Sequence, residues 1–322
     1  MRHNDDAFAT MLLMSQLSAD KDELVRPLSV GEYFDLRRCV KKAGLPGLGA
    51  LIGMDLSAVR SHLRLSEAEA YRVCVLLNRV MPLSYALERF SDGGIDIVTL
   101  DEDPYPARLR DRLGEKTPPM LYSVGAPALC DTCSAAVISN TVARKPALEC
   151  ALELTGRLLK AGVTLVTGGE VGFGRLVERE ALNGEGRVIT FLAESLTERV
   201  YQPGLSEMIA TERALCMSIV HPEAKYTAAH AMERNKCLYA LSDAAFVVSC
   251  EKEKGATWDG AVTALRNRYT ERLYVWENPD LPGNMELIAR GATPFSSPNE
   301  LPIDEMKASW TTPVYEQLSM FD

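Results

Sequence analysis

A short run of β-branched and apolar residues, 163–166, leads directly into four glycines within the seven residues 168–174. Residues 175–182 then follow a helical pattern. Glycine lets main-chain N–H groups approach an anion closely, and the dipole at a helix N-terminus favours negative charge. The order of strand, glycine-rich turn and helix therefore predicts a loop that faces a phosphate. That phosphate belongs either to a nucleotide or to a nucleic-acid backbone.

Length and charge narrow the classes of protein that fit. With 322 residues, the chain is long enough for two domains with well-buried cores. Its net charge of −9 argues against binding nucleic acid over the whole surface, although it allows a local basic face. No apolar run reaches the roughly 18 residues of a membrane helix, and the first residues lack the apolar core of a signal peptide. We therefore expect a cytoplasmic protein.

The eight cysteines show no framework spacing, and the close pair Cys130 and Cys133 stands alone. A zinc site needs four ligands, and no second pair of cysteines or histidines accompanies this one. We favour a loop with two reduced thiols over a metal site, and we expect no cofactor.

Residues 1–115 are predicted to be helical, as an accessory domain. Ser66 with Glu69 three residues later forms a capping-box pattern at a helix start. The segment 45–49, Leu-Pro-Gly-Leu-Gly, lies between two helical patterns, one of them over 24–40. It is either a plain helix connection, which we favour, or a turn of the helix-hairpin-helix kind whose amides touch phosphate. A turn at 92–94 then leads into an alternating strand.

From about residue 117 strands alternate with helical patterns, which predicts a doubly wound, mostly parallel, Rossmann-like sheet. Ligands of such sheets bind at the C-terminal ends of the strands. We expect three parts: a helical domain over 1–115, the Rossmann-like domain over 116–298 and a flexible tail over 299–322. The predicted strands are 95–100, 118–124, 135–138, 163–166, 187–192, 215–220, 244–249 and 272–276, with a helix over 146–160.

Residues of the types that bind phosphate follow the C-terminal ends of three predicted strands. A helix is expected to start near Gly255, with Thr257 as a cap that also donates to a phosphate. Trp258 either packs in the core or stacks on a base. Arg234, Asn235 and Lys236 form either a solvated helix face or a set of phosphate and sugar contacts. The expected phosphate contacts are Ser139, Asn140, Arg144, Lys145, Gly168, Gly169, Arg175, Lys225, Arg234, Asn235, Lys236, Lys252, Lys254, Gly255 and Thr257, with Tyr226 or Trp258 for stacking.

Taken in order over about residues 95–295, several segments resemble the DNA-processing protein A (DprA/Smf) family, within the SLOG group of Rossmann-like domains. The resemblance implies that the protein binds single-stranded DNA through backbone phosphates at the sheet edge. It also implies that the protein protects incoming strands and helps to load the RecA recombinase in natural transformation. The segments are Asp103-Pro-Tyr-Pro, Pro118-Pro-Met-Leu-Tyr, Gly162–Gly169, Arg234-Asn-Lys with Leu241–Ala244, Gly255-Ala-Thr-Trp, and Gly283-Asn with Gly291-Ala.

By position, Arg234, Asn235 and Lys236 match the family's basic triplet, and Gly168 and Gly169 match the start of its glycine loop. Two segments depart from the family pattern. Residues 139–141 read Ser-Asn-Thr where the family has Gly-Ser-Arg, and residues 171–174 lack the family's arginine and aspartate. Arg144 and Arg175 lie nearby as substitutes. These departures indicate a divergent branch whose role lies in transformation, phage defence or plasmid biology.

The segment Gln317-Leu-Ser-Met-Phe321 resembles the short peptide with which bacterial replication and repair proteins dock on the β sliding clamp. Leu318, Met320 and Phe321 would be the apolar anchors, and Gln317 a polar latch. The alternative is an amphipathic tail that packs back on its own domain.

Three functions remain open at this stage. We favour a single-stranded DNA binder without catalytic activity. The second is a nucleotide-binding or nucleotide-hydrolysing protein of the SLOG type, with a carboxylate such as Asp259, Glu170 or Glu178 near the glycosidic carbon. The third is a scaffold that tethers a partner to the clamp. The sequence leaves open whether RecA is a partner and whether the chain forms a homodimer.

Overall fold

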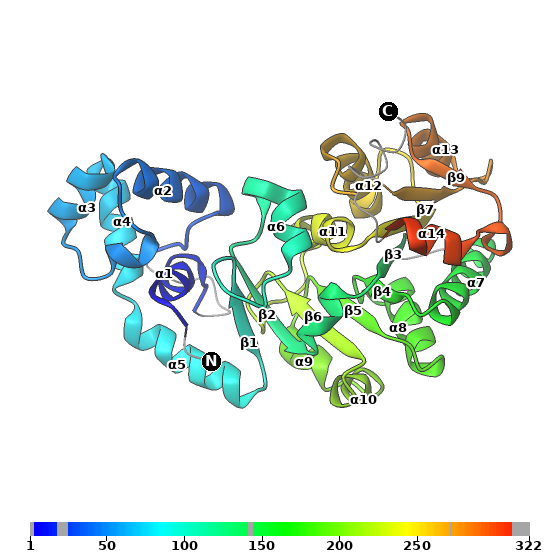
Figure 1. The fold of residues 1–322 in the computed structure, drawn as a ribbon, viewed down its shortest axis with the longest axis horizontal. Helices are drawn as coiled ribbons and strands as arrows, with labels where there is room; N and C mark the ends of the chain where they lie inside the picture. The colour runs from blue at the N-terminus through cyan, green and yellow to red at the C-terminus, as the bar shows by residue number, and fades with distance from the viewer. Residues whose placement is uncertain (1–2, 18–24, 141–143, 271, 311–322) are drawn as a thin grey trace. The chain divides into compact units, whose positions relative to one another are not determined.

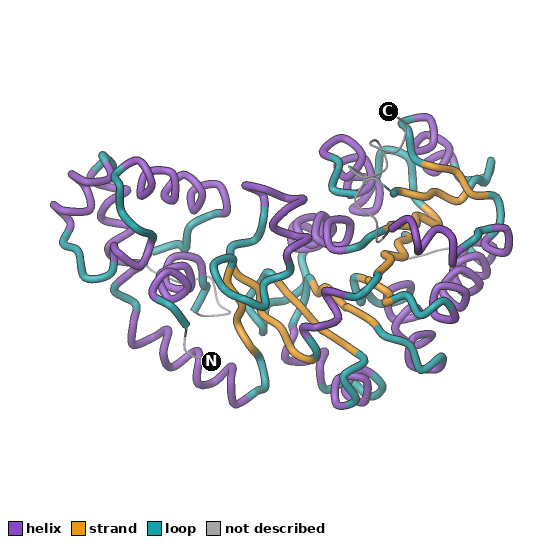
Figure 2. The backbone as a smooth tube through the Cα atoms, viewed as in Figure 1, coloured by secondary structure: helices purple, strands orange, loops and turns teal. Residues whose placement is uncertain are grey.

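The computed structural model describes residues 3–17, 25–140, 144–270 and 272–310 (Figures 1 and 2). The chain folds into two compact units. The first comprises Met1–Val124, Ser195–Thr197 and Ser218–Ala224, and the second comprises Gly125–Glu194, Glu198–Met217 and Lys225–Asp322.

The first unit is mainly helical, as predicted. Ser66 and Glu69 form the predicted capping box at the start of α4, and a second capping box joins Ser29 to Glu32. Each box satisfies main-chain N–H groups that have no partner inside the helix. The described helices up to Asp92 are α1 (Asp5–Met14), α2 (Val30–Lys42), α3 (Leu56–Leu63), α4 (Glu67–Leu77) and α5 (Val80–Asp92), with the short η1 (Leu48–Leu51).

The turn over 45–49 connects α2 to η1. The N–H of Gly49 donates to the Asp6 carboxylate at 2.6 Å. A β-carbon on Gly47 would lie 2.2 Å from Asp6 Oδ2, so this carboxylate lies directly against the turn. The Gly49 amide is therefore occupied, which supports a helix connection and argues against a phosphate-binding turn.

The first unit also contains two strands. β1 (Asp96–Thr99) pairs antiparallel with β2 (Met120–Gly125), so the predicted strand at 118–124 lies in this pair. Because of this pairing, the compact units divide at Val124–Gly125 and not at the expected 115–116. α6 (Ala107–Leu113) and η2 (Gly114–Lys116) connect the two strands.

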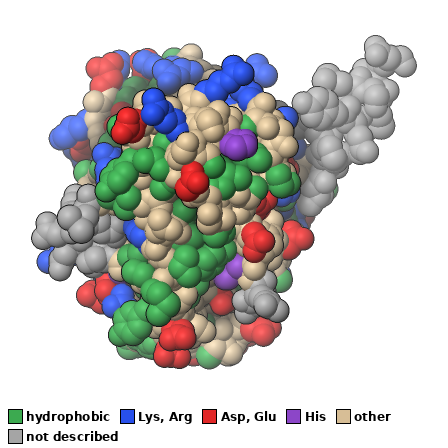
Figure 3. All heavy atoms as spheres, turned by 90° about the vertical axis from the view of Figure 1, so that its left-hand side faces the viewer, with side chains coloured by type: hydrophobic (Ala, Val, Ile, Leu, Met, Phe, Trp, Pro, Cys, Tyr) green, Lys and Arg blue, Asp and Glu red, His purple; other side chains and the backbone are tan. Residues whose placement is uncertain are grey.

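The surface of the first unit carries exposed hydrophobic side chains. Figure 3 shows such side chains gathered over one face, with Lys and Arg side chains along its upper edge. Five large hydrophobic residues of α3, α4 and α5 lie on the surface and not in the core: Leu56, Tyr71, Val80, Met81 and Tyr85.

The sheet of the second unit has the strand order β6-β5-β4-β3-β7-β8-β9, and every pair from β5 to β9 is parallel. The chain winds from β3 through β4 and β5 to one side, and it returns to place β7 and β8 on the other. This is the doubly wound arrangement that the alternating pattern predicted. The strands are β3 (Ser134–Ser139), β4 (Thr164–Thr167), β5 (Val188–Leu192), β6 (Ala214–Ser218), β7 (Ala244–Ser249), β8 (Leu273–Trp276) and β9 (Thr293–Phe295).

Helices lie on both faces of this sheet (Figure 1). α7 (Lys145–Lys160) packs with α8 (Phe173–Asn183), and α11 (Ala228–Leu241) packs with α12 (Gly255–Asn267). The short helices η3 (Pro127–Asp131), α9 (Leu196–Val200), α10 (Leu205–Ala210) and α13 (Pro282–Ala289) complete the connections. Among the described residues, none of these helices is long and apolar enough to cross a membrane.

Helical structure extends into the segment expected to be a tail. η4 (Pro298–Glu300) and α14 (Ile303–Trp310) lie within 298–310, and both Ile303 and Trp310 are buried. Trp310 packs edge-on against Phe246 of β7, which also stacks on Tyr274 at 4.9 Å. Burial of a tryptophan in this aromatic cluster fixes α14 to the second unit.

Candidate nucleic-acid interface

The order of the strands creates a switch point between β3 and β7. The chain leaves the C-terminal ends of these two neighbouring parallel strands in opposite directions, since β3 leads to β4 on one side and β7 leads to β8 on the other. Ligands of open parallel sheets bind in the crevice outside such a switch point. The loops after β3, β4 and β7 therefore meet where the sequence placed the phosphate site.

A small cavity of about 50 Å³ lies at this switch point. It is too small for a whole nucleotide, since pockets for small molecules measure ~300–1,000 Å³, but it has room for ordered water or part of a phosphate. Its lining brings together five of the predicted phosphate contacts with a carboxylate and an aromatic ring. The lining residues are Val137, Ile138, Ser139, Gly168, Glu170, Tyr226, Ala231, Arg234, Asn235, Leu238, Ala256 and Thr257.

Arg234 is buried in the wall of this cavity. Its Nη1 donates to the main-chain oxygen of Phe191 at 2.9 Å and lies 3.6 Å from Glu170 Oε2. Burial lowers the pKa of the Arg234 guanidinium, while the Glu170 carboxylate acts in the opposite direction. Its Nε is buried with no hydrogen-bond partner. The arginine is thus fixed in place, with one donor left over.

Asn235 and Lys236, the other two residues of the basic triplet, lie on different faces of α11 and make different contacts. Asn235 Nδ2 donates to the main-chain oxygen of Ala256 at 2.8 Å, so it ties α11 to the first turn of α12. Residues 231, 234, 235 and 238 of α11 share one helix face and line the cavity, as the 3.6-residue period requires. Lys236 lies off that face and pairs with Glu233 at 2.6 Å. Lys236 does not line this cavity, and its contact with a phosphate stays a prediction.

Gly168 and Gly169 shape the end of β4. A β-carbon on Gly168 would lie 1.5 Å from Arg234 Nη1, so only glycine lets the guanidinium approach. Gly169 has φ +64°, and its β-carbon would lie 2.5 Å from Thr190 Cγ2. The first part of the glycine loop therefore makes room for buried side chains, where the sequence indicated room for an anion.

The first turn of α12 has no side-chain cap. Its N-cap residue is Lys254, and Thr257 Oγ1 donates instead to the main-chain oxygen of Ser139 at 3.2 Å. The prediction of a Thr257 cap was wrong because the helix begins at Gly255, three residues too early for it. Ser139 Oγ is buried without a hydrogen-bond partner beside the same turn. Asn140 N–H donates to the oxygen of Ser249, which joins β3 to β7 beyond their last paired residues.

Exposed cations follow the strand ends. Lys145 pairs with Glu149 and Lys254 with Glu251, and the side chain of each lysine is about four-fifths exposed. Lys252 pairs with Glu286 at 3.0 Å. Arg144, at the start of α7, and Lys225, after β6, are exposed. Exposed pairs of this kind are weak and exchange readily for other partners.

The two aromatic candidates differ in exposure. Tyr226 is 56% exposed and lines the cavity. Trp258 is buried on α12, with the Arg290 guanidinium 5.3 Å from its ring centroid. The ring of Tyr226 is therefore accessible for stacking on a base, whereas Trp258 packs in the core.

A buried ion pair behind the glycine loop had no recognisable sequence signal. Arg199 donates to both carboxylate oxygens of Glu178, at 2.9 and 2.7 Å, and Thr190 donates to the same carboxylate. Arg175 lies near Glu194 at 3.8 Å and does not line the cavity. Its expected role as a substitute contact at this cavity is not supported by its position.

Two further expectations concern other parts of the chain. Cys130 is buried and Cys133 half-buried, and neither forms a disulfide within the described residues. Within the described ranges, no three His, Cys, Asp or Glu side chains are grouped closely enough to hold a metal ion. Gln317, Leu318, Met320 and Phe321 lie outside the described residues.

Comparison with known proteins supports the same fold. Residues 96–305 match the profile of the family described as DNA recombination-mediator protein A. The X-ray structure of DNA processing protein A from Streptococcus pneumoniae superposes with a TM-score of 0.63 and 16% identity, over 84% of this chain and 96% of that one. DNA processing protein A from Helicobacter pylori, a structure that describes its single-stranded DNA binding mode, gives 0.54 and 22%, over 67% and 98%. A search of curated protein sequences finds no significant match.

Proposed function

The chain belongs to the DNA recombination-mediator protein A family, and from that premise we propose that it binds single-stranded DNA at the β3–β7 switch point without catalysing a reaction. Membership of the family gives the protein a role in DNA processing and recombination. The single-stranded ligand and the position of its site are the parts that we propose.

The observation that carries this proposal is the uncapped start of α12. Its first N–H groups open at the switch point with no side chain that caps them, and Lys254 stands at the N-cap. The amide dipoles of a helix N-terminus favour a phosphate, and a lysine beside them adds a full charge. Lys252 and Arg144, on the loops after β7 and β3, extend the positive charge along the path of a strand.

In this proposal Arg234 and Asn235 act mainly as positioning residues. Arg234 is held by the Phe191 oxygen and Glu170, and Asn235 holds the Ala256 oxygen in the first turn of α12. Both therefore keep the α12 amides at the sheet edge, while the exposed lysines meet the phosphates. Tyr226 offers a ring on which a base stacks without regard to its sequence.

The nucleotide-hydrolysing alternative has less support. The cavity of about 50 Å³ is far smaller than the ~300–1,000 Å³ of typical small-molecule pockets. Its one carboxylate, Glu170, already pairs with Arg234. A hydrolase needs a carboxylate that is free to act at the glycosidic carbon.

The test is fluorescence anisotropy of a labelled 20-nucleotide single strand, titrated with the full chain at several salt concentrations. We expect salt-sensitive binding, since each neutralised phosphate releases counterions. The Lys254→Ala variant should weaken binding and reduce the slope against log salt by about 0.7, the loss of one phosphate contact on a single strand.

The matched control is Lys160→Ala. Lys160 is also exposed, but it ends α7 at the opposite end of the sheet from the switch point. Its removal should leave affinity and salt slope unchanged. No binding at low salt, or equal losses in the two variants, would overturn the proposed site.

The proposal extends to partners through the C-terminal peptide 317–321. Its Gln-Leu-Ser-Met-Phe sequence supports docking on the β sliding clamp through Leu318 and Phe321. Surface plasmon resonance with immobilised clamp should detect the chain and lose the signal in a Leu318→Ala/Phe321→Ala variant. The same variant should keep its affinity for single-stranded DNA. Transfer of a bound strand to a RecA-type recombinase and formation of a homodimer belong to the same proposal.

A further inference from the structure

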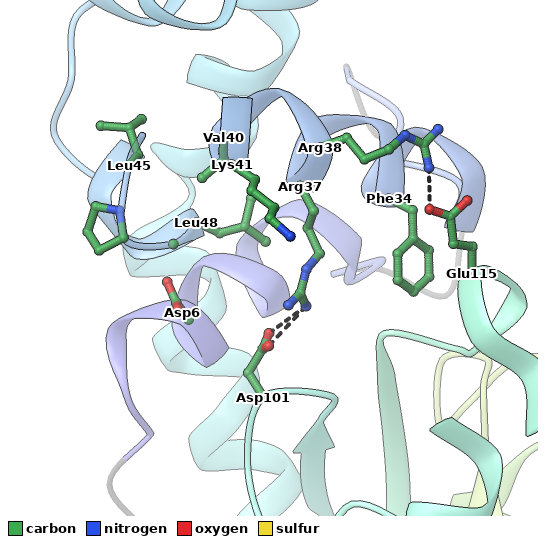
Figure 4. A pocket seen from close by; sticks show the side chains of 12 residues that line it. Asp6, Phe34, Arg37, Arg38, Val40, Lys41, Leu45, Leu48, Asp101 and Glu115 are labelled. Atoms are coloured by element: carbon green, nitrogen blue, oxygen red, sulfur yellow. Dashed lines mark hydrogen bonds and ion pairs between the residues drawn. The ribbon is translucent and has the colours of Figure 1, made fainter. Parts of the chain in front are cut away.

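A second cavity lies wholly within the first unit (Figure 4). Its volume is about 480 Å³, inside the ~300–1,000 Å³ range of small-molecule pockets. It is lined by α2, by Asp6 of α1, by the turn before η1, by Asp101 after β1 and by Glu115 of η2. The lining residues are Asp6, Phe34, Arg37, Arg38, Val40, Lys41, Leu45, Pro46, Gly47, Leu48, Asp101 and Glu115.

One face of α2 supplies an aromatic ring and three cations. Phe34, Arg37, Arg38 and Lys41 follow the i, i+3, i+4, i+7 spacing that places side chains on the same side of a helix. Figure 4 shows Phe34, Arg37 and Lys41 directed from α2 towards the side of the cavity that carries Asp101. A flat ring and positive charges thus share one wall, opposite carboxylates.

The cavity holds three cations and three carboxylates, but they do not all pair with one another. Arg37 pairs with Asp101 at 2.9 Å, and Arg38 pairs with Glu115. Lys41, by contrast, makes no ion pair within the part of the chain that the structure describes. One cation is therefore left for a ligand, next to carboxylates that still have acceptor capacity.

This mixture of groups selects the class of ligand. An acidic peptide would meet three carboxylates, and a purely apolar molecule would leave Lys41 without a partner. A nucleotide has a group for each part of this lining, because its base stacks on a ring, its exocyclic amino group donates to a carboxylate and its phosphate pairs with a lysine.

We propose that this cavity binds one nucleotide, with the base against Phe34, an amino group on Asp101 or Glu115 and the phosphate at Lys41. The nucleotide is either free or one unit of a single strand. The site is separate from the sheet edge, and the proposal does not depend on the function proposed above.

The test is isothermal titration of the full chain with dAMP, dCMP and dTMP. We expect dAMP and dCMP to bind more tightly than dTMP, since thymine has no exocyclic amino group for the carboxylates. Lys41→Ala should weaken dCMP binding about tenfold or more, the usual loss for a charge-assisted hydrogen bond. Phe34→Leu, which keeps an apolar side chain but removes the ring, should weaken it as well.

Lys42→Ala is the matched control. Lys42 is the next residue of the same helix turn, carries the same charge and does not line the cavity. Its removal should leave dCMP binding within twofold of wild type. Equal losses in Lys41→Ala and Lys42→Ala would overturn the proposal, as would unchanged binding in Lys41→Ala.

A second arm separates the two sources of the nucleotide. A single strand that carries one 5-iododeoxycytidine is irradiated with the full chain, and the cross-linked peptide is identified. A cross-link on Phe34 that dCMP competes away assigns the site to a strand; dCMP binding without that cross-link assigns it to a free nucleotide. No binding in either arm overturns the site. The proposed site at the sheet edge is tested with a different variant, Lys254→Ala. A failure of that proposal can therefore be told apart from a failure of this one.

Discussion

A β-carbon added to Gly168 would lie 1.5 Å from Nη1 of Arg234. The end of β4 and the buried guanidinium of α11 therefore occupy adjoining space that admits no additional atom. The same nitrogen donates to the Phe191 oxygen at 2.9 Å, so it cannot withdraw without losing a buried hydrogen bond. One glycine thus holds together the strand, the helix and the ion pair with Glu170.

Gly168→Ala should destabilise the protein by about 1–3 kcal/mol, the usual cost of overpacking a filled interior. It should also weaken single-stranded DNA binding, because a displaced Arg234 disturbs the wall beside α12. Urea unfolding and anisotropy measure the two effects. Gly156→Ala is the control: Gly156 lies inside α7 with nothing within 4 Å of an added β-carbon. It should raise stability by ~0.5–1 kcal/mol. Equal effects at both positions would contradict this account.

Glu170→Gln should raise the affinity for single-stranded DNA. The carboxylate lies 3.6 Å from Arg234 Nη1 and lines the small cavity, so its negative charge repels a phosphate bound at the neighbouring sheet edge. Removing one negative charge at this range should tighten binding roughly three- to tenfold at low salt, with a smaller gain as salt rises. Glu233→Gln removes a carboxylate from the outer face of α11 and should have little effect. A loss of affinity in Glu170→Gln would refute the repulsion between Glu170 and the phosphate.

Arg199→Met should destabilise the protein strongly. It would remove both arginine hydrogen bonds and leave the buried Glu178 carboxylate with the hydrogen bond from the Thr190 hydroxyl. Breaking a buried pair in this way costs about 3–5 kcal/mol, whereas replacing both partners is far milder. The double variant Glu178→Leu/Arg199→Met should therefore be more stable than Arg199→Met alone in urea unfolding. The opposite order would show that the unpaired Glu178 carboxylate is not the cause of the lost stability.

The sheet of the second unit could be predicted, apart from β9, because its buried strands are short β-branched or apolar runs, such as 163–166 and 244–249, bounded by turns and helices. The capping box of Ser66 and Glu69 was predictable for a similar reason, since it depends on residues three positions apart. Helix α14 was missed because its stability comes from packing Trp310 on Phe246, a contact between distant parts of the chain.

The position of the candidate site could be predicted from the sequence, but the contacts of its individual residues could not. The glycine-rich loop and the basic triplet both fall at the switch point, as predicted, yet the period of α11 directs Lys236 away from the cavity that Arg234 and Asn235 line. Thr257 was misassigned because a shift of three residues in the start of α12 changes which side chain can cap it. The Arg199–Glu178 pair depends on residues 21 positions apart, which no local pattern reveals.

Glu32 makes part of the free energy of unfolding depend on pH in the acidic range. Its hydrogen bond from Arg72, assisted by the capping box at Ser29, lowers its pKa from 4.5 to about 2. A carboxylate whose pKa is lower in the folded chain stabilises it fully above pH 4.5, and this contribution is lost as the pH falls from 4.5 towards 2.

Glu32→Gln should therefore reduce the difference in unfolding free energy between pH 7 and pH 3. Because the Glu32 side chain is 45% exposed, solvent screens the pair and the reduction should stay below ~1 kcal/mol. Urea unfolding of wild type and variant at the two pH values measures it. At pH 3 the two proteins should differ less than at pH 7, since wild-type Glu32 has then lost part of its advantage. A variant that loses as much stability between pH 7 and pH 3 as wild type would show that the Arg72 pair contributes nothing to the fold.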